Sequence, residues 1–391
     1  MMKKYLWSFA LSAIVLAGCG KKEEPPAPVA APAPVASAPA AAPVAVNTEE
    51  KVLNIYNWPD YVPEGMIAAF EKETGIKVNY DTFETNEALH AKLVAGNTGY
   101  DIVVPGSVFA KPQIEGGLLQ PLDKTKIKNL GNLDPAIMGT LAKNTDPDNK
   151  HLVPWAWGFT TVGINKTKVA KALGKTPMPE NAWDLVFKPE YTSKLKSCGI
   201  AYLDSPTEII PVALHYIGKN AYSNDVADYK AAAEMLAKVR KDVRIFSSTM
   251  IDDIAGGKAC VVIGWSGDIN IAAGRAKENK SKDEIESLLP STGALIFFDT
   301  MAITKDAKHP NNAMAFIDFY LRPENAALMT NEMNYPTANK AAVEKVKPEI
   351  AGNKTIFVEA DYFAKMIAPS SFSNEAREAM ATAYNGFKKG K

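Results

Sequence analysis

The stretch Leu152-Val-Pro-Trp-Ala-Trp-Gly-Phe-Thr-Thr-Val-Gly-Ile-Asn165 is apolar over most of its length and is too long for one ordinary strand. We interpret it as a strand that passes from one domain to another. A second extended stretch, Ala294–Asp299 followed by Met301–Ile303, is interpreted as a second crossing. Two α/β lobes joined by such crossings leave a cleft between them, and they can close on a ligand by a hinge motion.

The segment before the first crossing alternates strand and helix patterns. Three apolar stretches are predicted to be strands: Val52–Tyr56, Ile76–Tyr80 and Asp101–Val104. Between them, one helical face carries Val62, Met66, Ile67 and Phe70 and ends at Gly75, and a second carries Ala88, Leu89, Leu93 and Val94. This β-α-β-α-β order predicts a parallel sheet, which binds ligands beyond the carboxyl ends of its strands.

A second alternation of strands and helices follows the first crossing. The predicted elements are a strand at Cys198–Leu203, helices at Pro206–Tyr216 and Tyr229–Val239, and a strand at Cys260–Gly264. We therefore expect an α/β protein with a hinge and an interlobe cleft. Lobe I is expected to comprise residues 51–157 and 293–342, and lobe II residues 158–292 and 343–391.

The N-terminus has the pattern of an export signal. Lys3 and Lys4 precede an apolar stretch, Tyr5–Leu16, that is shorter than the ~20 residues needed to span a membrane. The stretch ends in Leu16-Ala17-Gly18-Cys19, which resembles the bacterial lipobox. Residues 1–18 are therefore predicted to be a lipoprotein signal peptide and Cys19 the lipidated residue. An ordinary secretory signal followed by a chance cysteine is the alternative.

Residues 19–50 are predicted to form an extended tether. The segment is dominated by Pro, Ala and Val, lacks the bulk to form a core, and favours polyproline II. Gly20 is not the aspartate associated with retention in the inner membrane, which slightly favours the outer membrane. The expected location is therefore the periplasm, with membrane contact through the lipid anchor alone.

Charge and cysteine content narrow the function. Lys+Arg and Asp+Glu both number 44, and there is no basic stripe, which argues against nucleic acid as a partner. Cys198 and Cys260 are the two cysteines that follow Cys19. In an oxidising compartment an even pair predicts a disulfide, and two buried free thiols are the alternative.

Sequence signatures of catalysis and cofactor binding are missing. There is no Gly-rich phosphate loop, no Cys-x-x-Cys and no Gly-x-Ser-x-Gly elbow. The four histidines lack metal-ligand spacing: His90, His151, His215 and His309. We expect no cofactor and no metal. Because a solute-binding protein needs no catalytic constellation, we expect an exported protein that is not an enzyme.

Three times an aromatic residue shortly precedes an aspartate at or after a predicted strand. The pairs are Trp58/Asp60, Trp265/Asp268 and Phe298/Asp299. An aromatic face offers a cation–π contact, and a carboxylate offers charge and hydrogen-bond acceptors. An organic ammonium ion requires this combination, so the pattern predicts a site for a small amine.

Several short segments together resemble one family: Asn54–Trp58, Phe70–Val78, Tyr100–Pro105 and Ile263–Asp268. In this order and spacing they are similar to the periplasmic polyamine-binding proteins of ABC importers, and the putrescine-binding branch is closest. The resemblance runs from about residue 51 to the end of the chain. It implies a two-lobed periplasmic binding protein of type II. Such a protein is expected to be a monomer that delivers putrescine or another short polyamine to ABC permease subunits in the inner membrane.

The resemblance also implies ligand contacts at particular positions: Trp58, Asp60, Tyr61, Ser107, Glu208, Trp265, Asp268, Phe297, Asp299 and Tyr335. Pro59 and Gly106 stand where the family often has hydroxyl residues, and Ser107 is expected to replace one of them. Phe297, where spermidine binders tend to carry Trp, favours a shorter diamine. The carboxylates exceed the two charges of putrescine, so they cannot all be unscreened in one dry pocket without raised pKa values.

Other interpretations of these residues stay open. Asp60 could cap a helix that starts near Val62, and Asp268 could cap a helix from Ile269 onward. Tyr61 and Tyr335 could be core residues. Three further tryptophans are interpreted as core or lobe-interface residues: Trp155, Trp157 and Trp183. Two alternative functions are a polyamine sensor that docks on a signalling receptor and an exported enzyme that acts on amines.

Overall fold

The computed structural model describes residues 48–59 and 61–390. The predicted signal peptide, Cys19, nearly all of the tether and Asp60 lie outside the described residues. The strands are β1 Val52–Asn57, β2 Lys77–Thr82, β3 Ile102–Val103, β4 Leu119–Gln120, β5 Val153–Asn165, β6 Ile200–Leu203, β7 Ile245–Ser247, β8 Val261–Trp265, β9 Ile285–Ser287 and β10 Leu295–Thr304.

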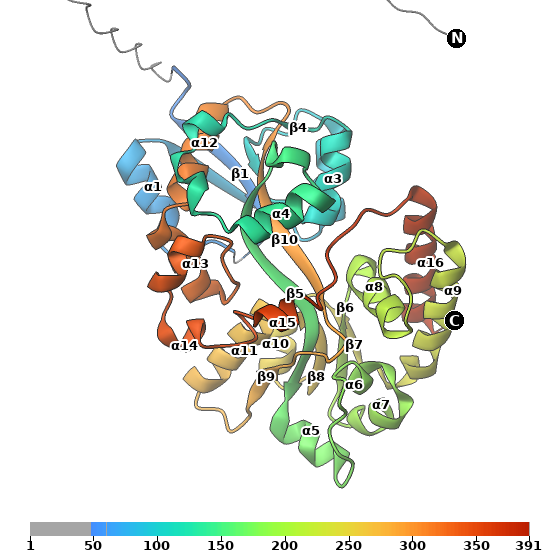
Figure 1. The fold of residues 1–391 in the computed structure, drawn as a ribbon. Coiled ribbons are helices and arrows are strands. Elements are labelled where there is room, and N and C mark those ends of the chain that lie inside the picture. The colour runs from blue at the N-terminus through green and yellow to red at the C-terminus, as the bar shows by residue number, and fades with distance from the viewer. Residues whose placement is uncertain (1–47, 60, 391) are drawn as a thin grey trace, which may run out of the picture. The chain divides into compact units, whose positions relative to one another are not determined.

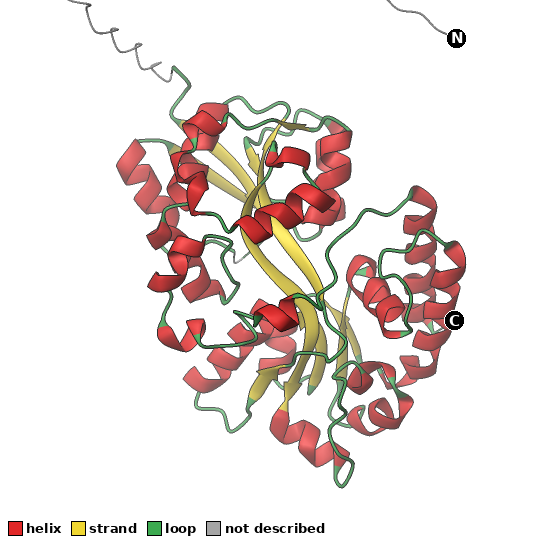
Figure 2. Cartoon of the chain, in the orientation of Figure 1, coloured by secondary structure: helices red, strands yellow, loops and turns green. Residues whose placement is uncertain are grey.

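Helices surround these strands on both sides (Figure 1 and Figure 2). They are α1 Met66–Thr74, α2 Asn86–Ala95, α3 Ser107–Glu115, α4 Pro135–Asn144, α5 Lys166–Leu173, α6 Asp184–Phe187, α7 Pro189–Leu195, α8 Pro206–Tyr216, α9 Val226–Val239, α10 Met250–Ala255, α11 Ser266–Glu278, α12 Pro310–Tyr320, α13 Pro323–Met333, α14 Pro348–Ala351, α15 Ala360–Phe363 and α16 Asn374–Lys389. Five short 3₁₀ helices occur among the described residues: Lys124–Lys126, Lys128–Asn132, Pro147–Asn149, Arg240–Asp242 and Lys340–Lys345.

The first three strands form the parallel arrangement that the sequence predicts. β1 pairs in parallel with β2 on one side and with β3 on the other. The first helix ends at Gly75 as expected, because this glycine adopts the left-handed conformation that closes a helix (φ 69°). Its start is later than the expected position near Val62: Gly65, also left-handed, precedes the first helical residue, Met66.

Strands β5 and β10 form a long antiparallel ribbon that carries the sheet from one group of strands to the other. The order is β2-β1-β3-β10-β5-β8-β6-β7. β10 pairs with β5 from Leu295, opposite Thr160, to Met301, opposite Val153. Beyond the ribbon, β10 pairs with β3, and β5 pairs with β8. The prediction of two extended crossings is confirmed, and β5 is buried along its whole length.

Apolar side chains gather in two large cores, one towards each end of the ribbon. One core includes Leu53 from β1, Phe70 from α1 and Phe316 from α12. The other includes Tyr202 from β6, Leu214 from α8 and Leu236 from α9. Full burial of each such side chain stabilises the fold by roughly 1.5–3 kcal/mol. The two cores define two lobes, and the ribbon passes through both.

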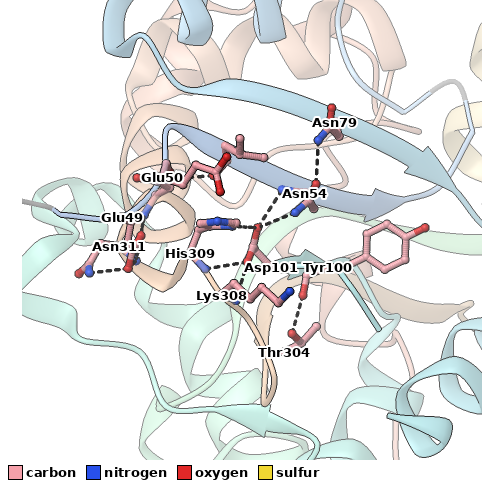
Figure 3. A network of polar contacts seen from close by, with 12 residues as sticks. Glu49, Glu50, Asn54, Asn79, Tyr100, Asp101, Thr304, Lys308, His309 and Asn311 are labelled. Atoms are coloured by element: carbon pink, nitrogen blue, oxygen red, sulfur yellow. Dashed lines mark hydrogen bonds and ion pairs between the residues drawn. The ribbon is translucent and has the colours of Figure 1, made fainter. Parts of the chain in front are cut away.

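A buried aspartate ties together three separate segments of the first lobe (Figure 3). The carboxylate of Asp101 accepts backbone N–H groups of Asn54, Lys308 and His309 at 2.9 Å. The ring of His309 also lies 3.0 Å from the same carboxylate through Nδ1. Because Asp101 directly precedes β3, this one side chain fixes β1 and the loop before α12 against that strand.

A disulfide joins Cys198 to Cys260, as the sequence predicts. The bond links residues 62 positions apart in the chain, with their Cα atoms 5.5 Å apart. Each cysteine lies just before one of the two adjacent parallel strands β6 and β8. The alternative of two free thiols is therefore wrong.

We expect reduction of this disulfide to destabilise the second lobe. A closed loop of about 60 residues stabilises a fold by roughly 4 kcal/mol in the chain-entropy model, and measured losses are typically 2–4 kcal/mol. Thermal melting with and without dithiothreitol measures the effect. The Cys198→Ala/Cys260→Ala variant should melt at the temperature of the reduced wild-type protein, both with and without dithiothreitol. An unchanged melting temperature of the reduced wild-type protein would contradict the expectation.

Candidate ligand-binding site

Asp299 lies at an irregularity in the middle of the ribbon. The pairing of β10 with β5 shifts between Asp299, opposite Ala156, and Thr300, opposite Pro154. Proline has no backbone N–H for a ladder hydrogen bond and is therefore found in central strands mainly at such bulges. On its other side, Asp299 pairs with Gly106, which follows β3. A bulge between the two lobes thus sets the position of a carboxylate that is only 8% exposed.

Two tyrosine–aspartate hydrogen bonds lie side by side at this point. The hydroxyl of Tyr61 donates to Asp299 Oδ2 at 2.8 Å, and the hydroxyl of Tyr335 donates to Asp268 Oδ1 at 2.7 Å. The two tyrosine rings meet edge to face with their centroids 5.5 Å apart. Burial, together with the neighbouring carboxylate, raises the pKa of each tyrosine well above its usual value. Both hydroxyls therefore stay protonated and can donate.

A third carboxyl group, that of Glu208, comes from the first turn of α8. It accepts a hydrogen bond from the hydroxyl of Thr160 in β5. Burial raises the pKa of Glu208 to about 7, although hydrogen bonds from Thr160 and Trp265 act in the opposite direction. Residue Glu208 thus brings a carboxyl group from the second lobe to the ribbon.

Asp299 and Glu208 are electrostatically coupled. Burial raises the pKa of Asp299 to about 7, the hydrogen bond from Tyr61 lowers it, and the charge of Glu208 raises it further. Neither carboxyl group forms an ion pair with any lysine, arginine or histidine that the structure describes. The expectation that surplus carboxylates have raised pKa values is met by these two residues. Two carboxyl groups in this arrangement favour the binding of a cation.

Aromatic side chains border the carboxyl groups. The half-buried ring of Phe297 lies 6.2 Å from that of Tyr335, centroid to centroid. Trp265, the last residue of β8, packs against both cores. Together with Tyr61 and Tyr335, these rings supply apolar surface beside negative charge, which suits an organic cation.

A groove lies between elements of the two lobes. It has a volume of about 340 Å³ and is lined by α2 and α3 on one side and by α8 and α16 on the other. Its lining includes Glu87 of α2, whose charge contributes to the raised pKa of Glu208. The groove therefore lies between elements of both lobes, and its lining includes none of the ten predicted contact residues.

Trp58 and Ser107 lie on the first lobe, near the ends of β1 and β3. The indole N–H of Trp58 donates to the carbonyl of Val104 at 3.0 Å, and its ring packs on Phe83. This hydrogen bond fixes the orientation of the indole. Ser107 opens α3, next to Gly106, and its buried hydroxyl has no hydrogen-bond partner among the described residues.

Several alternative interpretations can now be decided. Asp268 is not a helix cap, because α11 has Trp265 at its N-cap and Asp268 in its first turn. The helix expected to start near Val62 starts at Met66 with Gly65 at its N-cap, and Asp60 lies outside the described residues. Tyr61 and Tyr335 are buried, and both also donate to carboxylates. The prediction that three tryptophans are core or interface residues is confirmed by their burial: Trp155, Trp157 and Trp183.

Sequence reasoning missed three residues at the site. Thr160 holds Glu208, and Gly158 and Gly267 both approach the ring of Tyr335 closely. No local pattern distinguishes Thr160 from its neighbour Thr161, because its role depends on a helix 48 residues away.

Comparison with protein families identifies this architecture. Residues 65–357 match the family described as bacterial extracellular solute-binding protein. The chain belongs to this family. Its membership bears out the expectation that the chain is not an enzyme, and it agrees with a location outside the cytoplasm.

Two relatives illustrate the similarity at the sequence level. The putrescine-binding periplasmic protein PotF of Escherichia coli (strain K12) is 45% identical over 320 residues, which cover 81% of this chain and 86% of the relative. The putrescine-binding periplasmic protein SpuD of Pseudomonas aeruginosa (strain UCBPP-PA14) is 42% identical over 349 residues, which cover 89% and 95%.

Solved structures share the fold. A putative spermidine/putrescine ABC transporter protein from Listeria monocytogenes is 31% identical with a TM-score of 0.76, and the match covers 88% of this chain and all of that one. The PotD substrate-binding protein of Streptococcus pneumoniae is 27% identical with a TM-score of 0.72, covering 87% and 99%. The predicted two-lobed periplasmic binding protein fold is confirmed. Among the residues that the structure describes, no helix has the length and apolarity to cross a bilayer.

The raised pKa values predict how stability depends on pH. In the folded protein Asp299 and Glu208 titrate near 7, whereas their ordinary values are 3.8 and 4.5. Between about pH 4 and 7 the folded state therefore binds more protons than the unfolded state. Consequently, these groups make the free energy of unfolding fall as pH rises through that window.

Urea unfolding of the ligand-free protein at pH 5.0 and 7.5 tests this dependence. The Glu208→Gln/Asp299→Asn variant lacks both titrations. Relative to this variant, the wild-type protein should lose roughly 5 kcal/mol between the two pH values, because each of the two groups contributes about 1.4 kcal/mol per pH unit over about two units. Equal losses in both proteins would mean that neither carboxyl group has a raised pKa.

Proposed function

We propose that the protein is the substrate-binding component of an ABC importer that captures a polyamine, putrescine first, in the periplasm and delivers it to the membrane permease. The observation that carries the proposal is the electrostatically coupled pair formed by the buried Asp299 and the half-buried Glu208. These carboxyl groups lack a basic partner among the described residues and lie beside aromatic rings where the two lobes meet. The names of the two relatives, both putrescine-binding periplasmic proteins, support the same ligand.

Putrescine is chemically suited to these groups. It carries an ammonium group at each end of a four-carbon chain, so burial requires hydrogen-bond acceptors at both ends and an apolar sleeve between them. Carboxyl groups that titrate near pH 7 can exist as neutral acids in the empty cleft and can release their protons when a dication arrives. Micromolar affinity needs only about 8 kcal/mol of net binding free energy, which two charge-assisted ends and aromatic contacts can supply.

We assign the ligand contacts to the ten positions that the sequence predicts. Asp299, Glu208 and Asp268 would receive the ammonium groups. The remaining contacts would come from Trp58, Asp60, Tyr61, Ser107, Trp265, Phe297 and Tyr335. Tyr61 and Tyr335 orient Asp299 and Asp268 by donating hydrogen bonds to them. The smaller ring of Phe297 favours a diamine over a longer polyamine.

The N-terminal segment supports a membrane-attached form of the protein. We propose that residues 1–18 are removed as a lipoprotein signal, that Cys19 carries the lipid, and that residues 20–50 tether a monomeric binding domain, with the outer membrane favoured. The sequence Leu16-Ala17-Gly18-Cys19 supports this proposal. Mass spectrometry of the membrane-extracted protein would detect the lipid on Cys19, and an N-terminus elsewhere in the mature chain would contradict it.

Calorimetric titration tests the ligand assignment. At pH 7.5 putrescine should bind more tightly than cadaverine and spermidine, and a neutral solute of similar size should not bind. The absence of binding by any polyamine would overturn the proposed function.

Asp299→Asn should weaken putrescine binding about 10- to 100-fold, because a charge-assisted hydrogen bond is worth roughly 1.5–3 kcal/mol. The melting temperature of the ligand-free variant should not fall, since the carboxylate it replaces is buried and unfavourable at this pH. Glu284→Gln, which removes an exposed carboxylate paired with Lys166, is the control and should bind like the wild type. Unchanged affinity of Asp299→Asn would show that Asp299 does not contact the ligand.

A further inference from the structure

The ring of Tyr335 lies in a slot between two glycines from different parts of the fold. Gly158 belongs to the ribbon strand β5, and Gly267 belongs to the first turn of α11 in the second lobe. Tyr335 itself follows α13. We call the space that Gly158 and Gly267 leave for this ring the Tyr335 slot.

Gly267 leaves no room for a side chain. A Cβ atom at this position would lie 2.3 Å from Cε2, 2.4 Å from Cζ and 2.5 Å from Cδ2 of Tyr335. Non-bonded carbon atoms normally approach to about 3.5–4.0 Å, so a methyl group there would displace either the ring or the helix. Glycine at 267 therefore permits α11 to approach this closely.

Gly158 borders the other side of the same ring. A Cβ atom at Gly158 would lie 3.1 Å from both Cδ1 and Cε1 of Tyr335 and 2.7 Å from Cζ of Phe297. The atoms nearest Gly158 are thus on the side of the ring opposite to those nearest Gly267. Tyr61 and Phe297 pack against the ring as well, with centroids 5.5 and 6.2 Å from that of Tyr335.

The slot joins the two lobes at the binding site. The loop that carries Tyr335 is bonded to the ribbon and the first lobe, through Trp157 N–H to Pro336 O at 3.2 Å and Asp134 N–H to Ala338 O at 2.8 Å. The helix that carries Gly267 packs into the second core through Ile269. Seating the ring places the Tyr335 hydroxyl 2.7 Å from Asp268, so contact between the lobes and orientation of this carboxylate occur together.

We propose that Gly158 and Gly267 are positioning residues for ligand capture: they form the slot that lets the lobes close on Tyr335 and that aims its hydroxyl at Asp268. This inference rests on the proposed function and adds to it two residues that donate no group to a ligand. A side chain at either position holds the lobes apart or displaces the ring, and the ligand then leaves faster from an incompletely closed cleft.

Gly267→Ala tests the proposal, and Gly274→Ala is a matched control. Both glycines lie in α11, where alanine favours the helix over glycine, and a Cβ at Gly274 meets nothing within 4 Å. We expect Gly267→Ala to weaken putrescine binding about 10- to 100-fold, mostly through a faster dissociation rate in stopped-flow measurements. Gly158→Ala should act in the same direction, and Gly274→Ala should bind within about twofold of the wild type.

A double-mutant cycle separates positioning from simple damage to the helix. Tyr335→Ala removes the ring that the slot holds. In that background Gly267→Ala should weaken binding by less than about twofold further. The same 10- to 100-fold loss in both backgrounds, or wild-type affinity of Gly267→Ala, would overturn the proposal. If the wild-type protein bound no polyamine, the proposed function would fail instead, so the two failures are distinguishable.

Discussion

The antiparallel pairing of β5 with β10 is the interaction on which the rest of the structure depends. This pairing joins the strands of the two lobes into one sheet that runs between two separate apolar cores. Every residue of β5 is buried. Pro154 interrupts this ladder because it lacks an N–H, and the resulting shift sets the position of Asp299. One defect in a buried strand thereby places a carboxylate where both lobes can reach it.

The electrostatics of the site follow from that placement. Burial desolvates both carboxyl groups, and neutral donors rather than cations hydrogen-bond to them: Tyr61 donates to Asp299, and Thr160 and Trp265 donate to Glu208. A neutral donor stabilises a carboxylate less than an ion pair does, so desolvation prevails and both pKa values rise. Both carboxyl groups are therefore largely protonated below about pH 7.

Sequence alone predicted the elements that apolar periodicity determines. The crossings, the parallel β1–β2–β3 arrangement and α8 follow from local runs of residues. The disulfide between the two cysteines follows from the export signal, because exported proteins fold in an oxidising compartment. Contacts between distant residues had no local signature. Gly158 and Gly267 matter only because one tyrosine ring lies between them. Val62 was placed in a helix by its spacing, but the left-handed Gly65 delays that helix to Met66.

The ribbon also has a consequence for the order in which the chain can fold. The first lobe acquires its central strand only when β10 pairs with β3, a contact between residues such as Ile303 and Ile102. The hydrogen bond between Tyr61 and Asp299 spans 238 positions. Contacts of such long range are slow to form because loop-closure entropy opposes them. Because the proposed contacts run from Trp58 to Tyr335, a chain that emerges from its N-terminus cannot complete the site until residue 335 of 391 has arrived.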